Sequence, residues 1–189
     1  MRPRTAVPAA LLTVALTAMV AGCGSDEPSA AGADTPSAAR SSSPAASMPE
    51  GSPQVPETLR FTGTTVDGKS FDAATLAGKP VVLWFWAPWC PKCRAQAAET
   101  AKVAEEFADK AHVLGVAGLD KNDAMRDFVA ETGAEGFPHL SDENGEVWQR
   151  FEVTEQSRYV ILDQNGEQVY EGVLPAGEGL ADKLTELTG

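Results

Sequence analysis

Residues 81–93 have the sequence VVLWFWAPWCPKC, and this stretch decides the fold. Its first six residues form an apolar run rich in β-branched and aromatic side chains, which is typical of a strand buried on both faces. Residues 94–107 follow with alanine and phenylalanine at helical spacing. The sequence therefore predicts that Cys90 and Cys93 lie where a central strand turns into a helix.

This position favours a reactive cysteine. The N-terminus of a helix carries free N–H groups and a partial positive charge, and both stabilise a thiolate. A cysteine so placed in a Cys-x-x-Cys pair can have its pKa lowered from about 8.5 into a range of about 3.5–7.5. We predict that Cys90 is the attacking sulfur and that Cys93, one turn later on the same helical face, resolves a mixed disulfide. Pro91 fits the first turn, where its missing N–H is no loss, and Lys92 adds a cation nearby.

Two simpler interpretations of the cysteine pair are a structural disulfide and one half of a zinc site. A structural zinc ion needs four ligands. The chain has two histidines, His112 and His139, neither at metal-ligand spacing, and no second cysteine pair. The pattern therefore favours redox chemistry, with no metal and no cofactor beyond a redox-active Cys90–Cys93 disulfide.

Residues 76–93, LAGKPVVLWFWAPWCPKC, closely resemble the thioredoxin superfamily. Within it they resemble the extracytoplasmic TlpA/ResA/DsbE-like branch, which shares the redoxin, AhpC/TSA-type domain. The resemblance covers about residues 57–189. It implies a thioredoxin-like α/β fold, in which a mixed β-sheet has helices on both faces and is preceded by an N-terminal β-hairpin.

The rest of this region agrees with that fold. Turn residues 66–68 separate two short strands, and residues 163–166 separate two more, as in β-hairpins. Leucines at helical spacing near the end predict a closing helix. The expected elements are strands at 59–64, 69–71, 113–117, 159–162 and 168–173, a helix from 120 that ends at Gly133, and a last helix marked by Leu180, Leu184 and Leu187.

The N-terminal part is not predicted to be globular. Residues 1–22 have two arginines before an apolar run, which is typical of a signal peptide and too short for a confident membrane span. Residues 20–23, VAGC, resemble a bacterial lipoprotein cleavage box, which implies that a lipidated Cys23 anchors the protein to the outer face of the cell membrane. The alternative is a secreted protein in which Cys23 is lost or idle. Either protein is extracytoplasmic, where disulfides persist.

Residues 23–56 are rich in serine, alanine and proline, so a disordered tether is expected between the anchor and the domain at 57–189. The whole chain carries a net charge of −12. This acidity argues against binding to nucleic acid and against a polybasic patch that would bind a membrane.

The sequence departs from the resembled family at the loop facing the cysteines. The family has a cis-proline there, and the matching position here is Ser157. A cis bond before a residue other than proline costs about 2.5–4 kcal/mol, so we expect the Gln156–Ser157 bond to be trans, or strained if cis. In the family this loop offers backbone groups to an extended substrate, which makes Gln156 and Ser157 candidate substrate contacts.

Two further departures remove acids near the cysteines. Gln96 stands where related reductases often carry a glutamate, and Trp84 stands where thioredoxin has a buried aspartate. Without a carboxylate as base, Cys93 is expected to resolve mixed disulfides slowly, unless Glu99 points toward it. Trp84 is expected in the core, whereas Trp89 is expected to be an exposed substrate platform. His139 is expected to be hydrogen-bonded rather than catalytic.

These features predict a thiol–disulfide oxidoreductase that exchanges disulfides with exported proteins and is reset by a membrane redox partner, with oxidation as the preferred direction. One alternative is a reductant in cytochrome c maturation. Another is a thiol peroxidase, although Leu83 and Ala87 occupy the positions where peroxiredoxins carry proline and threonine or serine. The last is a lipoprotein that binds without catalysis.

Overall fold

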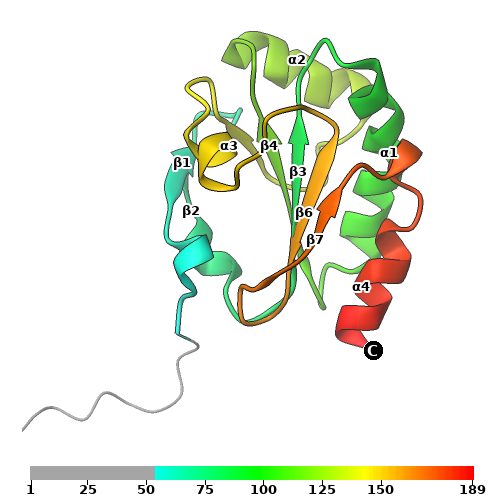
Figure 1. Cartoon of the computed structure of the whole chain (residues 1–189). Helices are drawn as coiled ribbons and strands as arrows, with labels where there is room; N and C mark the ends of the chain where they lie inside the picture. Colours follow the sequence, from blue (N-terminus) through cyan, green and yellow to red (C-terminus); the bar gives the residue numbers. More distant parts are fainter. Residues whose placement is uncertain (1–53) are drawn as a thin grey trace, which may run out of the picture. The chain divides into compact units, whose positions relative to one another are not determined.

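The computed structural model describes residues 54–189, so the predicted leader, Cys23 and most of the predicted tether lie outside the described residues. The described chain is an α/β domain (Figure 1). Its strands and α-helices are β1 (Thr62–Thr64), β2 (Ser70–Asp72), β3 (Val81–Trp86), α1 (Pro91–Glu106), β4 (His112–Ala117), α2 (Asn122–Thr132), β5 (His139–Ser141), α3 (Glu146–Arg150), β6 (Arg158–Leu162), β7 (Gln168–Gly172) and α4 (Leu180–Thr188), with 3₁₀ turns η1 (Glu57–Leu59), η2 (Ala73–Leu76) and η3 (Pro175–Gly177).

The main sheet has five strands in the order β5-β4-β3-β6-β7. Strands β3, β4 and β5 run parallel, while β6 is antiparallel to both β3 and β7. Strands β1 and β2 form a separate antiparallel hairpin before it. The structure therefore confirms the predicted mixed sheet and N-terminal hairpin. All six residues of β3 are buried, as the apolar run predicted.

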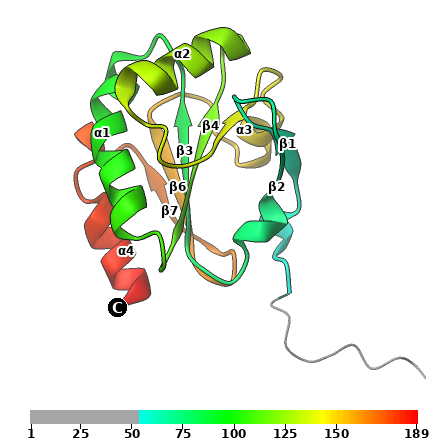
Figure 2. The same ribbon diagram turned by 180° about the vertical axis from the view of Figure 1, so that it is seen from behind.

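The side chains of β3 alternate between two hydrophobic clusters, because successive residues of a strand point to opposite faces. Val82, Trp84 and Trp86 pack with residues of α1, α2 and α4. The intervening residues of β3 pack with α3 and with residues next to the β1–β2 hairpin. Figures 1 and 2 show α1 and α4 on one side of the sheet and α3 with the hairpin on the other, so helices cover both faces as predicted.

The alignment of β3 with its neighbours places the cysteines. Strand β3 pairs through Trp86 with Ala117 of β4, and through Phe85 with Arg158 of β6. The chain leaves β3 at its carboxyl end and enters α1 at Pro91. The residues just before β6 therefore lie beside the start of α1, although more than 60 residues separate them along the chain.

One helix was not assigned from the sequence. Residues 146–150 form the short helix α3, because the Asp142 carboxylate accepts hydrogen bonds from the backbone N–H groups of Glu146, Val147 and Trp148 at 2.8–2.9 Å. Val55 and Pro56, the last residues of the predicted tether, are half-buried against the domain. Within residues 54–189, no helix is long and apolar enough to cross a membrane.

Candidate active site

Cys90 and Cys93 form a disulfide at the junction of β3 and α1. Cys90 is the N-cap residue of α1, and its Sγ accepts the backbone N–H of Cys93 at 3.1 Å. Pro91 occupies the first turn of the helix. The structure thus confirms the predicted position of both cysteines, with Cys90 Sγ facing a free N–H group at the positive end of the helix dipole.

The two sulfurs differ in access. The Cys90 residue keeps 2% of its surface exposed, whereas Cys93 has none. Cys90 is therefore the less deeply buried residue of the pair. The roles of Cys90 as the attacking sulfur and of Cys93 as the resolving sulfur stay predictions.

Ser157 faces both sulfurs from the loop before β6. Its Oγ lies 3.7 Å from Cys90 Sγ and 3.7 Å from Cys93 Sγ. The peptide bond before Ser157 is trans, as expected, and its φ of +75° is in the left-handed region that few residues other than glycine adopt. Its N–H donates a 2.8 Å hydrogen bond to the carbonyl of Phe85 in β3. Gln156, the other predicted contact in this loop, is half-buried beside it.

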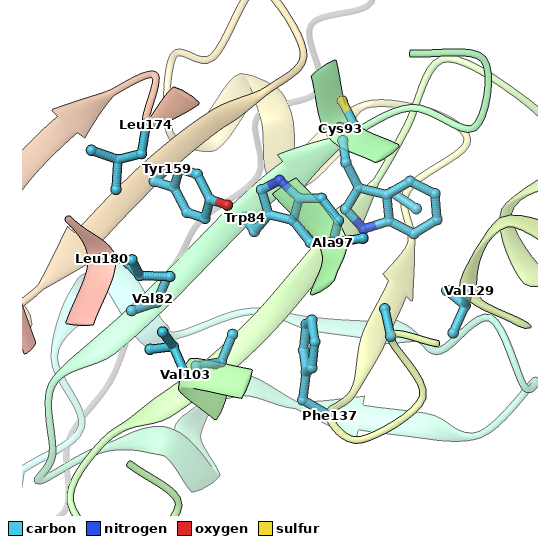
Figure 3. Packing of buried hydrophobic residues seen from close by; sticks show 14 of the residues in the cluster. Val82, Trp84, Cys93, Ala97, Val103, Val129, Phe137, Tyr159, Leu174 and Leu180 are labelled. Carbon is cyan, nitrogen blue, oxygen red and sulfur yellow. The ribbon is translucent and has the colours of Figure 1, made fainter. Parts of the chain in front are cut away.

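Gln96 and Trp84, the two positions without the expected acids, are hydrogen-bonded to each other. The buried Gln96 accepts the indole N–H of Trp84 at 2.9 Å. Its amide NH₂ donates to the carbonyls of Ser157 at 3.1 Å and Leu174 at 2.9 Å. Figure 3 shows Trp84 and Leu174 in the cluster that also holds Cys93. Gln96 thus ties α1 to β3 and to the loop that carries Ser157, a role not predicted from the sequence.

The alternative base, Glu99, lies elsewhere on α1. Its carboxylate pairs with Lys102 at 3.6 Å, and its side chain packs against Gly177 of η3. Glu99 therefore does not take the place of the missing acid. Thr100 of the same helix is hydrogen-bonded to the Tyr159 hydroxyl at 2.7 Å, where burial raises the pKa of Tyr159.

Two exposed apolar residues are Trp89, which directly precedes Cys90 in the chain, and Leu119, which Trp89 contacts. Trp89 has 54% of its surface exposed, as predicted, and its indole N–H donates to the carbonyl of Leu119 at 3.3 Å. Leu119 is 53% exposed and has a φ of +62°. We call these two residues the apolar rim. Lys92 is also exposed, on the first turn of α1. Leu119 escaped sequence analysis because a leucine just after a buried strand is more often part of the core.

His139 is buried in the core rather than in the active site. Its Nδ1 accepts the indole N–H of Trp86 at 3.2 Å, and its Nε2 lies 2.7 Å from the carbonyl of Ala134. The ring is therefore neutral with its proton on Nε2, and burial lowers the pKa of His139 to about 4. The expectation of a hydrogen-bonded histidine is confirmed. Among residues 54–189, no group of three His, Cys, Asp or Glu side chains could hold a metal ion.

Comparison with known proteins agrees with this arrangement. The chain is 40% identical over 114 residues to the soluble secreted antigen MPT53 of Mycobacterium tuberculosis, which is 60% of this chain and 65% of that protein. The solved structure of MTB dsbF is 40% identical, with a TM-score of 0.66, and covers 71% of this chain and 99% of its own. A secreted Mycobacterium tuberculosis disulfide oxidoreductase homologous to E. coli DsbE is 35% identical, with a TM-score of 0.63, covering 69% and 98%.

The sequence profile of the AhpC/TSA family matches residues 54–171, which is more than half of the chain. The match includes β1 to β6, the cysteine pair and Ser157. Together with the mixed sheet and the disulfide at the start of α1, it establishes that the chain belongs to the AhpC/TSA family, within the thioredoxin superfamily.

Proposed function

We propose that the protein is an extracytoplasmic thiol–disulfide oxidoreductase that oxidises thiols of exported proteins through Cys90 and Cys93. The observation that carries this proposal is the disulfide at the N-terminus of α1, in which the backbone N–H of Cys93 donates to the sulfur of Cys90, the less deeply buried cysteine. A related secreted protein of Mycobacterium tuberculosis is described as a disulfide oxidoreductase, which supports the same activity here.

The proposed reaction has two exchanges. A client thiolate attacks Cys90 Sγ, the Cys90–Cys93 bond breaks, and Cys93 leaves as a thiolate. A second client thiolate then attacks the client sulfur of the mixed disulfide, and Cys90 leaves as a thiolate. The client dithiol loses two electrons and becomes a disulfide, while the enzyme pair gains them. A membrane redox partner is proposed to reoxidise the pair.

The surroundings of Cys93 favour this direction. In a reductant, Cys93 has to lose its proton before it attacks the mixed disulfide, and a nearby base assists that step. The position of such a base is held by the neutral Gln96, whose amide is fully engaged with Trp84, Ser157 and Leu174. In an oxidase, Cys93 leaves as a thiolate, so this step needs no base.

The apolar rim supports a protein client rather than a small molecule. Trp89, the residue before Cys90, and its contact Leu119 present exposed apolar surface, and exposed aromatic residues of this kind often anchor protein contacts. The leader at residues 1–22 and the lipidation motif at Cys23 support a location outside the cytoplasm, on a membrane anchor. The secreted relative MPT53 supports the location, and a secreted form without the anchor is the alternative.

The other candidate functions have weaker support. A reductant in cytochrome c maturation lacks the acid that would activate Cys93. A thiol peroxidase lacks its usual groups, because Leu83 and Ala87 are buried apolar residues at the corresponding positions. A lipoprotein that only binds clients would not need the cysteine pair.

Three assays on the full chain test the proposal: oxidative refolding of a reduced protein, reduction of insulin, and redox titration of the pair in glutathione buffers. We expect refolding activity that is lost in Cys90→Ser, and a potential nearer to about −120 mV than to about −270 mV. A potential near the lower value with insulin reduction would identify a reductant. Activity in neither assay, with Cys90 titrating like free cysteine, would indicate a binding protein.

A further inference from the structure

Among the residues described, the side chain of Ser157 is the one polar group within hydrogen-bonding distance of both sulfurs of the disulfide. Its Oγ lies 3.7 Å from each sulfur, within the range of hydrogen bonds to sulfur. Neither sulfur of a disulfide carries a proton. In both contacts the serine hydroxyl is therefore the donor and the sulfur the acceptor.

The hydroxyl is held in this place by its backbone. The Ser157 N–H is bonded to the Phe85 carbonyl at 2.8 Å, and the Ser157 carbonyl accepts from the Gln96 amide at 3.1 Å. Gln96 is itself fixed by Trp84 and by the Leu174 carbonyl. Both polar groups of the Ser157 backbone are thus engaged on opposite sides, while φ stays at +75°. Such strain persists where the surroundings determine it and occurs often at functional sites.

The two thiolates formed in the proposed reaction need different support. The Cys90 thiolate can keep the Cys93 N–H as a donor at 3.1 Å. Cys93 is fully buried, and within residues 54–189 the Ser157 hydroxyl is the only hydrogen-bonding partner of its sulfur. A buried charge without a donor is strongly unfavourable, so the departure of Cys93 as a thiolate depends on a group in this position.

We propose that the Ser157 hydroxyl is a catalytic hydrogen-bond donor that serves both leaving sulfurs in turn. This inference rests on the proposed oxidase function and deepens it. When the client thiolate bonds to Cys90 Sγ, the hydroxyl donates to the departing Cys93 thiolate. When the second client thiol gives its proton to the Cys93 thiolate and, as a thiolate, forms the client disulfide, the same hydroxyl turns to the departing Cys90 thiolate. The hydroxyl keeps its proton throughout. The electron pair of each broken S–S bond stays on the departing cysteine sulfur, first that of Cys93 and then that of Cys90.

The test compares Ser157→Gly with Ser157→Ala in the full chain. Both variants lack the hydroxyl, but glycine adopts a φ of +75° without strain and alanine does not. We expect both to raise the pKa of Cys90 by about one and to shift the glutathione equilibrium about tenfold toward the disulfide, which corresponds to about 30 mV. Both should slow client oxidation about tenfold. The pKa is measured by the rate of alkylation and the ultraviolet absorbance of the thiolate across a pH series.

Ser141→Ala is the matched control, because the Ser141 hydroxyl also contacts a sulfur, that of Met125 at 3.5 Å, but belongs to β5. It should leave the pKa of Cys90 and the glutathione equilibrium unchanged. The inference is overturned if Ser157→Gly keeps the wild-type pKa and equilibrium. It is also overturned if the Cys90 pKa and the glutathione equilibrium differ between the alanine and glycine variants in proportion to the stability of each variant. A purely structural role of Ser157 predicts that result.

These outcomes are separable from the fate of the proposed function. A wild-type protein that oxidises clients while Ser157→Gly matches it in pKa, equilibrium and rate overturns only the role of Ser157. A wild-type protein without exchange activity overturns the oxidase proposal. The pKa and glutathione measurements would still show whether the hydroxyl stabilises the thiolates.

Discussion

The indole N–H of Trp84 donates a 2.9 Å hydrogen bond to the side-chain carbonyl of Gln96, inside the core and between β3 and α1. Each residue stands at a position where the resemblance to the family led us to expect an acid. Together they form a neutral pair in which the indole donor has an acceptor, and the remaining amide hydrogens hold the carbonyls of Ser157 and Leu174. This neutral pair cannot transfer a proton as an acid would. It instead holds the Ser157 loop in place through the hydrogen bond from Gln96 to the Ser157 carbonyl.

Restoring the acid should destabilise the protein in a pH-dependent way. In Gln96→Glu, the new carboxylate would be buried against two carbonyl oxygens without the amide hydrogens that now satisfy them. Burial and these acceptors favour the protonated acid, so its pKa in the folded state lies above the unfolded value of about 4.3. The variant should thus lose the most stability above that folded pKa, about 2–3 kcal/mol relative to wild type at pH 7, and less at acidic pH.

Urea denaturation of both proteins at several pH values measures this difference. Gln96→Met is the control, since it fills the site without an ionisable group and should lose a similar amount of stability at every pH. A Gln96→Glu penalty that does not grow as pH rises would contradict the assignment of the two carbonyl contacts.

His139 should make folding sensitive to acid. Burial lowers its pKa to about 4 in the folded protein, against 6.5 for the ordinary value, so the unfolded state binds a proton more readily between these two pH values. Its contribution to stability is complete above pH 6.5 and is lost as pH falls toward about 4. The lost contribution is about 3 kcal/mol, since each pKa unit corresponds to about 1.4 kcal/mol.

The check is the urea midpoint followed from neutral to acidic pH in wild type and in His139→Gln. Glutamine can accept from Trp86 and donate to the Ala134 carbonyl, but it cannot take up a proton in this range. Carboxylates elsewhere titrate equally in both proteins, so the difference between the two curves reports His139. Parallel curves would show that the histidine is already protonated or exposed.

Gly115 should not tolerate a side chain. A Cβ at this position of β4 would lie 2.0 Å from Nδ1 of His139, and the ring cannot withdraw because Trp86 and Ala134 hold both of its nitrogens. We expect Gly115→Ala to lower the free energy of unfolding by about 3 kcal/mol. Gly136→Ala, where nothing lies within 4 Å of the added Cβ, is the control and should have little effect. Thermal or chemical unfolding distinguishes the two, and equal stabilities would show that β5 moves freely away from β4.

The elements with strong local patterns could be predicted from the sequence. The run at 81–86, the glycine at 133 and the two hairpin turns define β3, the end of α2 and both β-hairpins through neighbouring residues alone. The cysteine pair was predictable because its chemistry depends on the strand–helix junction that encloses it. Helix α3 was not, because five residues carry too little periodicity and its N-cap residue, Gly145, has no capping side chain.

The contacts around the cysteine pair could not be predicted from the sequence either. Ser157 was expected to matter for what it lacks, the ring of a proline, rather than for its hydroxyl. Its contact with Cys90 joins residues 67 positions apart, and it depends on a positive φ that no sequence pattern around Ser157 indicates. Leu119 was missed for a related reason, since its exposure follows from the left-handed turn after β4.

The apolar rim should affect protein clients more than small thiols. Trp89→Ala removes an exposed ring next to Cys90, and Leu119→Gly removes the leucine while relieving its φ of +62°. Because anchor residues of protein contacts contribute more than about 1 kcal/mol, we expect each variant to slow oxidation of a reduced protein about tenfold. Reaction with glutathione, which is too small to cover both residues, should slow by less. Val169→Ala, at an exposed apolar residue of β7, is the matched control and should leave both rates unchanged. Equal losses with protein and with glutathione would assign the rim to the chemistry of Cys90 rather than to client binding.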